Sequence, residues 1–146
     1  MINQKNFMGS IIKILVLYEE RFWKAKGFSG ETLSDCIDSP VFNAYDDSRP
    51  KGNGEVQPAI VVFVNGAVAR YWGRKDQLQQ RTLEKLAQYF GEKALNPLEA
   101  HIQNWSDDEY IRGGPVGNFP PGTLVEVGDI SESEGRVHWA GTETAH

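Results

Sequence analysis

The sequence predicts an α+β fold in which a mixed β-sheet is backed by one main helix. Short runs of β-branched and aliphatic residues recur along the chain, as they do in strands. One stretch, residues 75–90, instead has apolar residues at the spacing of an amphipathic helix. The strand-like runs outnumber this helix, and the helix follows two of them, which favours the α+β class.

Each element has its own signal. GSIIKILVLY contains the first buried strand, interrupted by Lys13, and AIVVFV contains the second, which Asn65-Gly66 should break with a tight turn or bend. Residues 47–54 are rich in turn formers. In the helix, Leu83, Leu86, Ala87 and Phe90 share one face, with Asp76 near its start and Gly91 near its end.

The last third of the chain is less regular. LEAHIQNW, TLVEVGDI and RVHWA (residues 136–140) are expected strands, whereas GGPVGNFPPG has too many glycines and prolines for regular structure. Residues 141–145 are the kind of small polar turn that leads from a strand into a helix. Such turns can bind an anion through free backbone N–H groups.

Composition excludes several classes of function. The 146 residues carry a net charge of −5 without a Lys/Arg stripe, so nucleic acid and anionic membranes are not expected partners. The longest apolar run, residues 11–18, is too short to span a bilayer and lacks the flanks of a signal peptide, which favours a cytoplasmic location. Cys36 is the single cysteine and there are three histidines, so neither a disulfide nor a Cys/His metal site is expected.

Five short motifs, taken in order, resemble the C-terminal half of the flavin-containing monoamine oxidase family. They are MGSIIK (residues 8–13), DD followed by P-x-G (46–52), NW (104–105), FPPG (119–122) and AGTETA (140–145). The resemblance implies that residues 1–110 are a substrate-domain-like α+β region. It also implies that residues 111–146 are a flavin-facing loop and strands of an incomplete FAD-binding domain. No G-x-G-x-x-G dinucleotide motif follows a strand, so the chain resembles a fragment.

The resemblance also assigns candidate site residues. Lys13 has the position of the family lysine that reaches the flavin N5 through a water, a catalytic role, and the alternative is a lysine that snorkels from an edge strand. Trp105 matches a tryptophan packed near the flavin, with ordinary core packing as the alternative. Gly141, Thr142 and Glu143 match a turn that contacts FAD, with a plain strand-to-helix turn as the alternative.

Gly113 and Gly114 match the glycine pair before the family's flavin-facing segment. Animal monoamine oxidases have at the position of Gly114 a cysteine that bonds to FAD, and at Pro115 a tyrosine of the aromatic cage around the amine. Here the flavin would be held non-covalently, and Pro115 leaves the class of amine open. His101 and His138 are expected to be structural, and the acidic run 107–109 is expected to be a solvated link.

Two functions are compatible with this sequence. The first is a fragment of an FAD-dependent amine oxidase, which oxidises an amine and returns the electrons to O₂. As an isolated chain it is expected to bind no FAD and to be inactive. The alternative is a stand-alone, non-catalytic α+β module that forms homo-oligomers through an exposed apolar interface.

Overall fold

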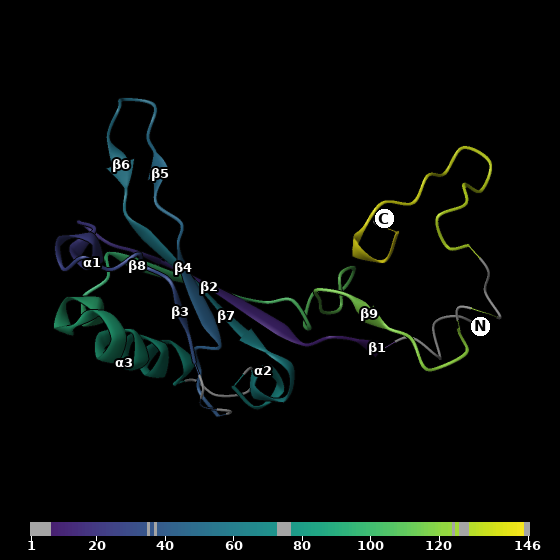
Figure 1. Cartoon of the computed structure of the whole chain (residues 1–146), viewed down its shortest axis with the longest axis horizontal. Coiled ribbons are helices and arrows are strands. Elements are labelled where there is room, and N and C mark those ends of the chain that lie inside the picture. Colours follow the sequence, from purple (N-terminus) through teal and green to yellow (C-terminus); the bar gives the residue numbers. More distant parts are fainter. Residues whose placement is uncertain are drawn as a thin grey trace.

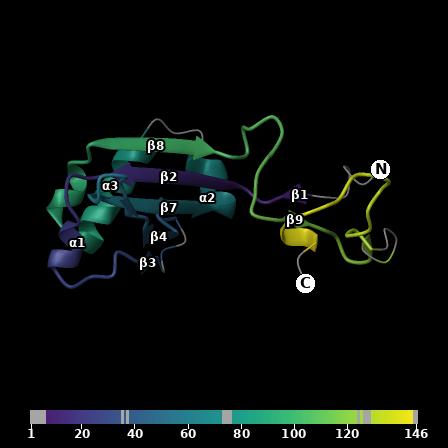
Figure 2. The same cartoon turned by 90° about the horizontal axis from the view of Figure 1, so that it is seen from above.

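A five-stranded antiparallel sheet forms the centre of the structure, a computed structural model that describes residues 7–34, 36, 38–72, 77–123, 125 and 129–144 (Figures 1 and 2). The strand order is β3-β4-β7-β2-β8. The strands are β2 (Ile11–Leu17), β3 (Thr32–Leu33), β4 (Asn43–Asp46), β7 (Ala59–Asn65) and β8 (Glu99–Asn104). The predicted strands at GSIIKILVLY, AIVVFV and LEAHIQNW are therefore confirmed as β2, β7 and β8.

The expectation of a mixed sheet is wrong, because every described neighbour pair in this sheet is antiparallel. The helical connection from β7 to β8 is long enough to join two parallel strands. However, β2 lies between β7 and β8 and runs against both, so the two parallel strands never pair.

Side-chain alternation in β2 gives the sheet one covered and one open face. Ile12, Ile14 and Val16 are fully buried on the covered face, while Lys13 and Leu15 on the other face are only half-buried. Helix α3 (Leu78–Phe90) packs in the layer beside the sheet (Figure 1), and its buried residues are Leu78, Thr82, Leu86 and Phe90. The main predicted helix is thus confirmed, while its expected first residues, including Asp76, lie outside the described residues.

Helical segments other than α3 were not expected from the sequence. Helix α2 (Gly66–Trp72) begins directly after β7 at Gly66, whose φ of 62° is one that glycine tolerates. The break at Asn65-Gly66 is therefore present, but a helix follows it. Helix α1 (Phe22–Ala25) follows β2, and the 3₁₀ helix η2 (Glu92–Leu95) follows α3. These segments are too short for helical periodicity to reveal them.

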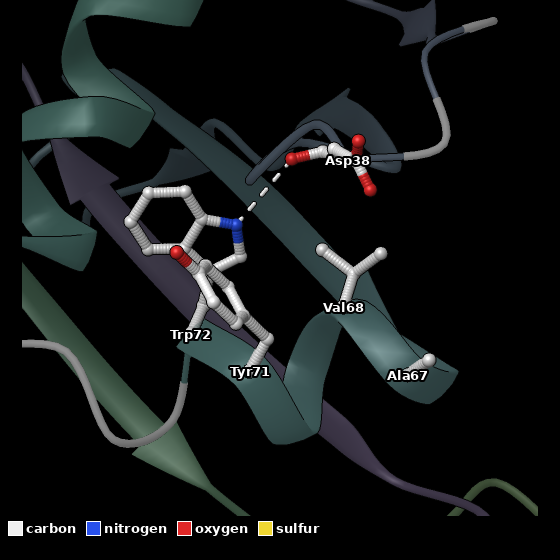
Figure 3. A pocket seen from close by; sticks show the side chains of 5 residues that line it. All are labelled: Asp38, Ala67, Val68, Tyr71 and Trp72. Carbon is white, nitrogen blue, oxygen red and sulfur yellow. Dashed lines mark hydrogen bonds between the residues drawn. The ribbon is translucent and has the colours of Figure 1, made fainter.

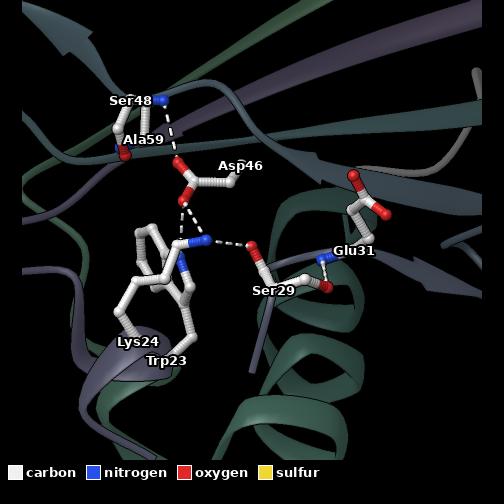
Figure 4. Close-up of polar contacts among 7 residues, drawn as sticks. All are labelled: Trp23, Lys24, Ser29, Glu31, Asp46, Ser48 and Ala59. Carbon is white, nitrogen blue, oxygen red and sulfur yellow. Dashed lines mark hydrogen bonds and ion pairs between the residues drawn. The ribbon is translucent and has the colours of Figure 1, made fainter. Parts of the chain in front are cut away.

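Asp46 joins α1 to the sheet through a compact polar cluster (Figure 4). Its carboxylate accepts hydrogen bonds from Trp23 Nε1 at 3.0 Å and from the Ser48 amide at 3.0 Å, and Lys24 Nζ lies 3.4 Å away. Gly30 completes the cluster, since a Cβ there would lie 2.8 Å from Trp23 Nε1. The first aspartate of the DD motif therefore has a structural role. After it, β5 (Arg49–Pro50) and β6 (Val56–Gln57) form a hairpin around the predicted turn.

After β8 the chain leaves the sheet and forms an extended arm, residues 105–144, in which β9 (Gly117–Asn118) pairs with β1 (Phe7–Met8) (Figures 1 and 2). The expected strand at residues 136–140 is wrong: it contributes a single bridge between Glu134 and Val137, and Trp139 is 52% exposed. A strand needs a neighbour for its backbone groups, and the described residues offer only its own turn.

The expected strand in TLVEVGDI is also not observed. Thr123 and Val125 have helical backbone, and residues 124 and 126–128 lie outside the described residues. None of the helices in the described part of the chain combines the length and hydropathy needed to cross a membrane.

Candidate functional site

The glycine pair of the arm packs against the segment that leads into β2. The Gly114 amide donates to the Gly9 carbonyl at 2.8 Å, and the Gly9 amide donates to the Val116 carbonyl at 3.3 Å. A Cβ on Gly9 would lie 2.3 Å from the Gly114 oxygen, and one on Gly113 would lie 2.2 Å from the Gly9 oxygen. Neither approach leaves room for a side chain. Close backbone contact is therefore one sufficient reason for glycine at these positions.

The terminal turn lies against the same arm segment. Gly141 precedes the 3₁₀ turn η3 (Thr142–Thr144). Glu143 Oε1 accepts the Gly117 amide at 2.6 Å, and Thr142 Oγ1 lies at the longer distance of 3.5 Å from the Pro115 carbonyl. The structure thus brings the terminal turn and the Pro115–Gly117 backbone together, although they are far apart in sequence.

Trp105 follows β8 and is held at the start of β2. Its amide donates to the Ile11 carbonyl at 3.1 Å, and its side chain is half-buried. The Trp105 and Gly113–Gly114 segments therefore both hydrogen-bond the short stretch from Gly9 to Ile11. This stretch is the structural junction of the predicted site.

Lys13 lies two residues beyond that junction, in the open face of the sheet. It is directly opposite Phe63 in β7 on one side and Gln103 in β8 on the other, and Phe63 is in turn opposite Asn43 in β4. Residues opposite one another in antiparallel strands share a face, so these four side chains form a row across four strands. Because β2 has a neighbour on both sides, the alternative of an edge-strand lysine is wrong.

The row of Asn43, Phe63, Lys13 and Gln103 has a defined polar and aromatic character. Lys13 Nζ lies 5.9 Å from the centroid of the Phe63 ring, within the range of a cation–π contact. Tyr45 packs edge-on to Phe63 at 6.3 Å and accepts a hydrogen bond from Asn43 Nδ2 at 3.0 Å. Asn43 Oδ1 is buried and has no hydrogen-bond partner among the described residues. The row therefore offers one ammonium group, one aromatic face and one unpaired acceptor.

Four members of this site were not predicted: Asn43, Tyr45, Phe63 and Gln103. The alternation of strand residues predicts which side chains share a face within one strand. It does not predict which residue of another strand lies opposite, because register depends on turn geometry and on pairing at a distance.

A separate pocket of about 590 Å³ lies beside α2 (Figure 3). It is lined by Asp38, Ala67, Val68, Tyr71 and Trp72, and Trp72 Nε1 donates to the Asp38 carbonyl at 3.4 Å. None of the sequence-predicted site residues lines this pocket. Its size is that of a small-molecule site, but it shares no lining residue with the row of Asn43, Phe63, Lys13 and Gln103.

Comparison with known proteins defines the class. The sequence pattern of the family described as "Flavin containing amine oxidoreductase" matches residues 3–146, and the chain belongs to this family. The resemblance drawn from the five motifs is thereby confirmed.

The relatives include curated proteins and solved structures. The chain is 38% identical over 147 residues to "Probable flavin-containing monoamine oxidase A" of Dictyostelium discoideum. This match covers 99% of this chain and 31% of the relative. It is 37% identical over 142 residues to "Amine oxidase [flavin-containing]" of Danio rerio, covering 94% of this chain and 27% of the relative. The chain thus spans about a third or less of the length of these relatives.

The fold agrees with solved amine oxidases. Cyclohexylamine oxidase from Brevibacterium oxydans IH-35A matches with a TM-score of 0.79 at 29% identity, covering 99% of this chain and 32% of that structure. A putrescine oxidase bound to putrescine matches with a TM-score of 0.82 at 26% identity and the same coverage. The α+β arrangement with its antiparallel sheet therefore corresponds to a segment of a flavin amine oxidase.

Proposed function

We propose that this chain supplies the substrate-facing wall of an enzyme that oxidises an amine with FAD as electron acceptor and O₂ as final oxidant. The observation that best supports this is the row of Asn43, Phe63, Lys13 and Gln103 on the open face of the sheet. Family membership and the likeness to a putrescine-bound oxidase also support an amine as the substrate.

The chain falls into two parts in this proposal. Residues 1–110 are the substrate-domain part, since they contain α3 and the five-stranded sheet, whose last strand ends at Asn104. Residues 111–146 belong to the flavin side, since their described part lies outside the sheet and hydrogen-bonds the segment that leads into β2. The Gly9–Ile11 junction connects the two parts.

The residues on the open face fit a planar, partly polar cofactor and its substrate. The buried oxygen of Asn43 has no hydrogen-bond partner in the described part of the chain, which is costly unless a ligand or water donates to it. The Phe63 ring supplies a flat apolar contact, and the Lys13 ammonium is a donor and proton carrier on the same face. FAD, when bound, supplies the two-electron acceptor for the oxidation.

We assign roles to the residues on this basis. With FAD bound, Lys13 would hold a water and exchange a proton, and Trp105 would pack near the ring system. The backbone of Gly113, Gly114, Gly141 and Thr142 would contact the cofactor, and Pro115 would contact the substrate. Because residue 114 is glycine and has no thiol, FAD is held without a covalent bond.

A chimera tests the proposal. The corresponding segment of the Dictyostelium relative is replaced by this chain, and flavin absorbance and amine-dependent hydrogen peroxide formation are measured with putrescine and cyclohexylamine. We expect a yellow, active chimera, in which Lys13→Met retains flavin but loses most of the peroxide formation. Lys51→Met in the β5–β6 hairpin is the control and should leave both unchanged. A chimera that binds flavin but oxidises no amine would contradict the proposal.

The chain alone is expected to be colourless and inactive, because the dinucleotide motif that supplies much of the FAD contact in such proteins is absent from its sequence. Purified chain, incubated with FAD and desalted, should show no visible flavin absorbance. A yellow preparation that oxidises an amine would show that the 146 residues form a complete site.

Self-association is the second candidate property, favoured by exposed apolar side chains. Tyr110 is 87% exposed and Val125 is 89% exposed in the arm, and Leu33 at the sheet edge is 71% exposed. Apolar surface of this kind promotes association when no partner covers it. Light scattering should show dimers or larger species, and a clean monomer at high concentration would argue against it.

A further inference from the structure

The short β1–β9 ribbon leaves one buried amide pointing away from its partner strand. Gly9 donates to Val116, so the adjacent pair of Met8 and Gly117 is a non-hydrogen-bonded pair of the antiparallel ladder. The Gly117 N–H therefore points to the side away from β1. Gly117 is buried, so this donor needs an acceptor from elsewhere in the chain.

Glu143 supplies that acceptor across 26 residues of sequence. Its Oε1 accepts the Gly117 amide at 2.6 Å, and hydrogen bonds to a carboxylate are stronger than those to a neutral acceptor. The carboxylate takes the place of a neighbouring strand at this one position. Without this carboxylate the buried amide would have lost its hydrogen bond to water and gained none in the protein, which is destabilising.

Glu143 belongs to a turn that closes on Gly141. Glu143 Oε2 lies 3.4 Å from the position of a Cβ on Gly141, and the Thr144 amide and hydroxyl both donate to the Gly141 carbonyl at 3.2 Å. The turn is thus compact. The hydrogen bond from the Gly117 amide to Glu143 is the shorter of its two side-chain hydrogen bonds to the rest of the arm. The contact from Thr142 to Pro115 is much longer, at 3.5 Å.

We propose that Glu143 is a positioning residue that holds the turn of residues 141–144 against the Pro115–Gly117 backbone by accepting the Gly117 amide. The resemblance implied that Glu143 contacts FAD, whereas here its carboxylate binds the Gly117 amide. In this arrangement Oε1 is occupied, and Gly141 and Thr142 are the groups left to face the cofactor. That last step rests on the proposed function, whereas the hydrogen bond and its effect on the turn do not.

The test is made on the chain alone, without flavin, by measuring amide exchange with water by NMR. In Glu143→Ala we expect the Gly117 amide to exchange about tenfold faster or more, because a charge-assisted hydrogen bond is lost. Glu143→Gln retains an oxygen of the same reach and should restore much of the protection. Glu132→Ala, which removes an exposed glutamate from the same arm, is the matched control and should change nothing.

Two further measurements separate positioning from general stability. The thermal midpoint should stay the same in all variants, because the hydrogen bond of Glu143 lies within the arm and outside the sheet and α3. Tryptic cleavage at Arg136 should accelerate in Glu143→Ala only. Unchanged exchange at Gly117 in Glu143→Ala, or an equal change in Glu132→Ala, would overturn the proposal. Loss of amine oxidation in the chimera would instead count against the proposed function and leave this inference intact.

Discussion

Lys13 and Phe63 lie directly opposite each other on the two central strands of the sheet, with the lysine Nζ 5.9 Å from the centroid of the ring. This pair lies on the face of the sheet opposite to the one that buries Ile12, Ile14 and Val16. A cation beside an aromatic face is a modest attraction in water and a larger one when a ligand removes the water. The pair is therefore suited to a site that is completed by a cofactor and a substrate.

The contact between Gly9 and Gly114 should tolerate no side chain. In Gly9→Ala, the new Cβ would overlap the Gly114 oxygen, so the arm must move away from the start of β2. We expect a loss of about 1–3 kcal/mol in the local free energy of opening, measured as faster amide exchange at Gly114. Gly52→Ala is the control, because no atom lies within 4 Å of a Cβ there. Equal exchange in both variants would refute the role of this contact.

The buried hydroxyl of Tyr18 should stabilise the fold as a neutral donor. Tyr18 is 2% exposed and donates to the Ala94 carbonyl at 3.1 Å, and burial raises the pKa of its phenol. Tyr18→Phe should lower the free energy of unfolding at pH 7 by about 1 kcal/mol, as measured by urea denaturation. Tyr110→Phe, at an exposed site, should have no effect.

The alkaline side gives a second measurement for Tyr18. Because its pKa is higher in the folded than in the unfolded state, the stabilisation is complete below the unfolded value, about pH 10. It is lost as the pH rises further. The stability of the wild type should therefore fall more steeply above pH 10 than that of Tyr18→Phe, and parallel curves would contradict this assignment.

Asp46 should make the stability depend on pH in the acid range. Burial raises the pKa of its carboxyl, but hydrogen bonds from Ser48, Trp23 and Lys24 together lower it below the ordinary value. A lowered folded pKa means that the stabilisation is present above the unfolded pKa, about 3.9, and is lost as the pH falls through the folded pKa. Asp46→Asn should be less stable by about 1–2 kcal/mol at pH 7, measured by urea denaturation.

The difference between wild type and Asp46→Asn should shrink below pH 4, where the wild-type carboxyl becomes protonated. Glu132→Gln, an exposed acid outside the cluster, is the control and should follow the wild type at every pH. A constant difference between wild type and Asp46→Asn from pH 7 to pH 3 would show that ionisation of Asp46 does not stabilise the fold.

The sequence predicted the elements with strong local patterns. The β-branched runs of β2 and β7 and the apolar face of α3 bury their side chains wherever they pack, so their periodicity is visible without a structure. The strand expected at residues 136–140 has the same alternation, but the described chain provides it with no neighbour. Local pattern predicts what a segment can bury, and pairing decides whether it becomes a strand.

The site was predicted to a different depth. The motifs were sufficient to place the chain in its family, because the order and spacing of short motifs can be compared from the sequence alone. They did not predict the partners of Asn43 and Phe63, or that Glu143 binds the Gly117 amide, because these contacts join residues that are distant in sequence.

The amino-acid sequence by itself determined family, fold class and the positions of the principal strands and helix, because each follows from short-range pattern and residue type. The tertiary structure alone decided that the sheet is antiparallel throughout its described pairs and that Lys13 faces Phe63. It also decided that Gly9, Gly113 and Gly114 form close contacts at the junction of the arm with β2, and that Glu143 binds a backbone amide within the arm. The physical reason is that register and close approach depend on chain segments meeting in space, and no local preference specifies that meeting.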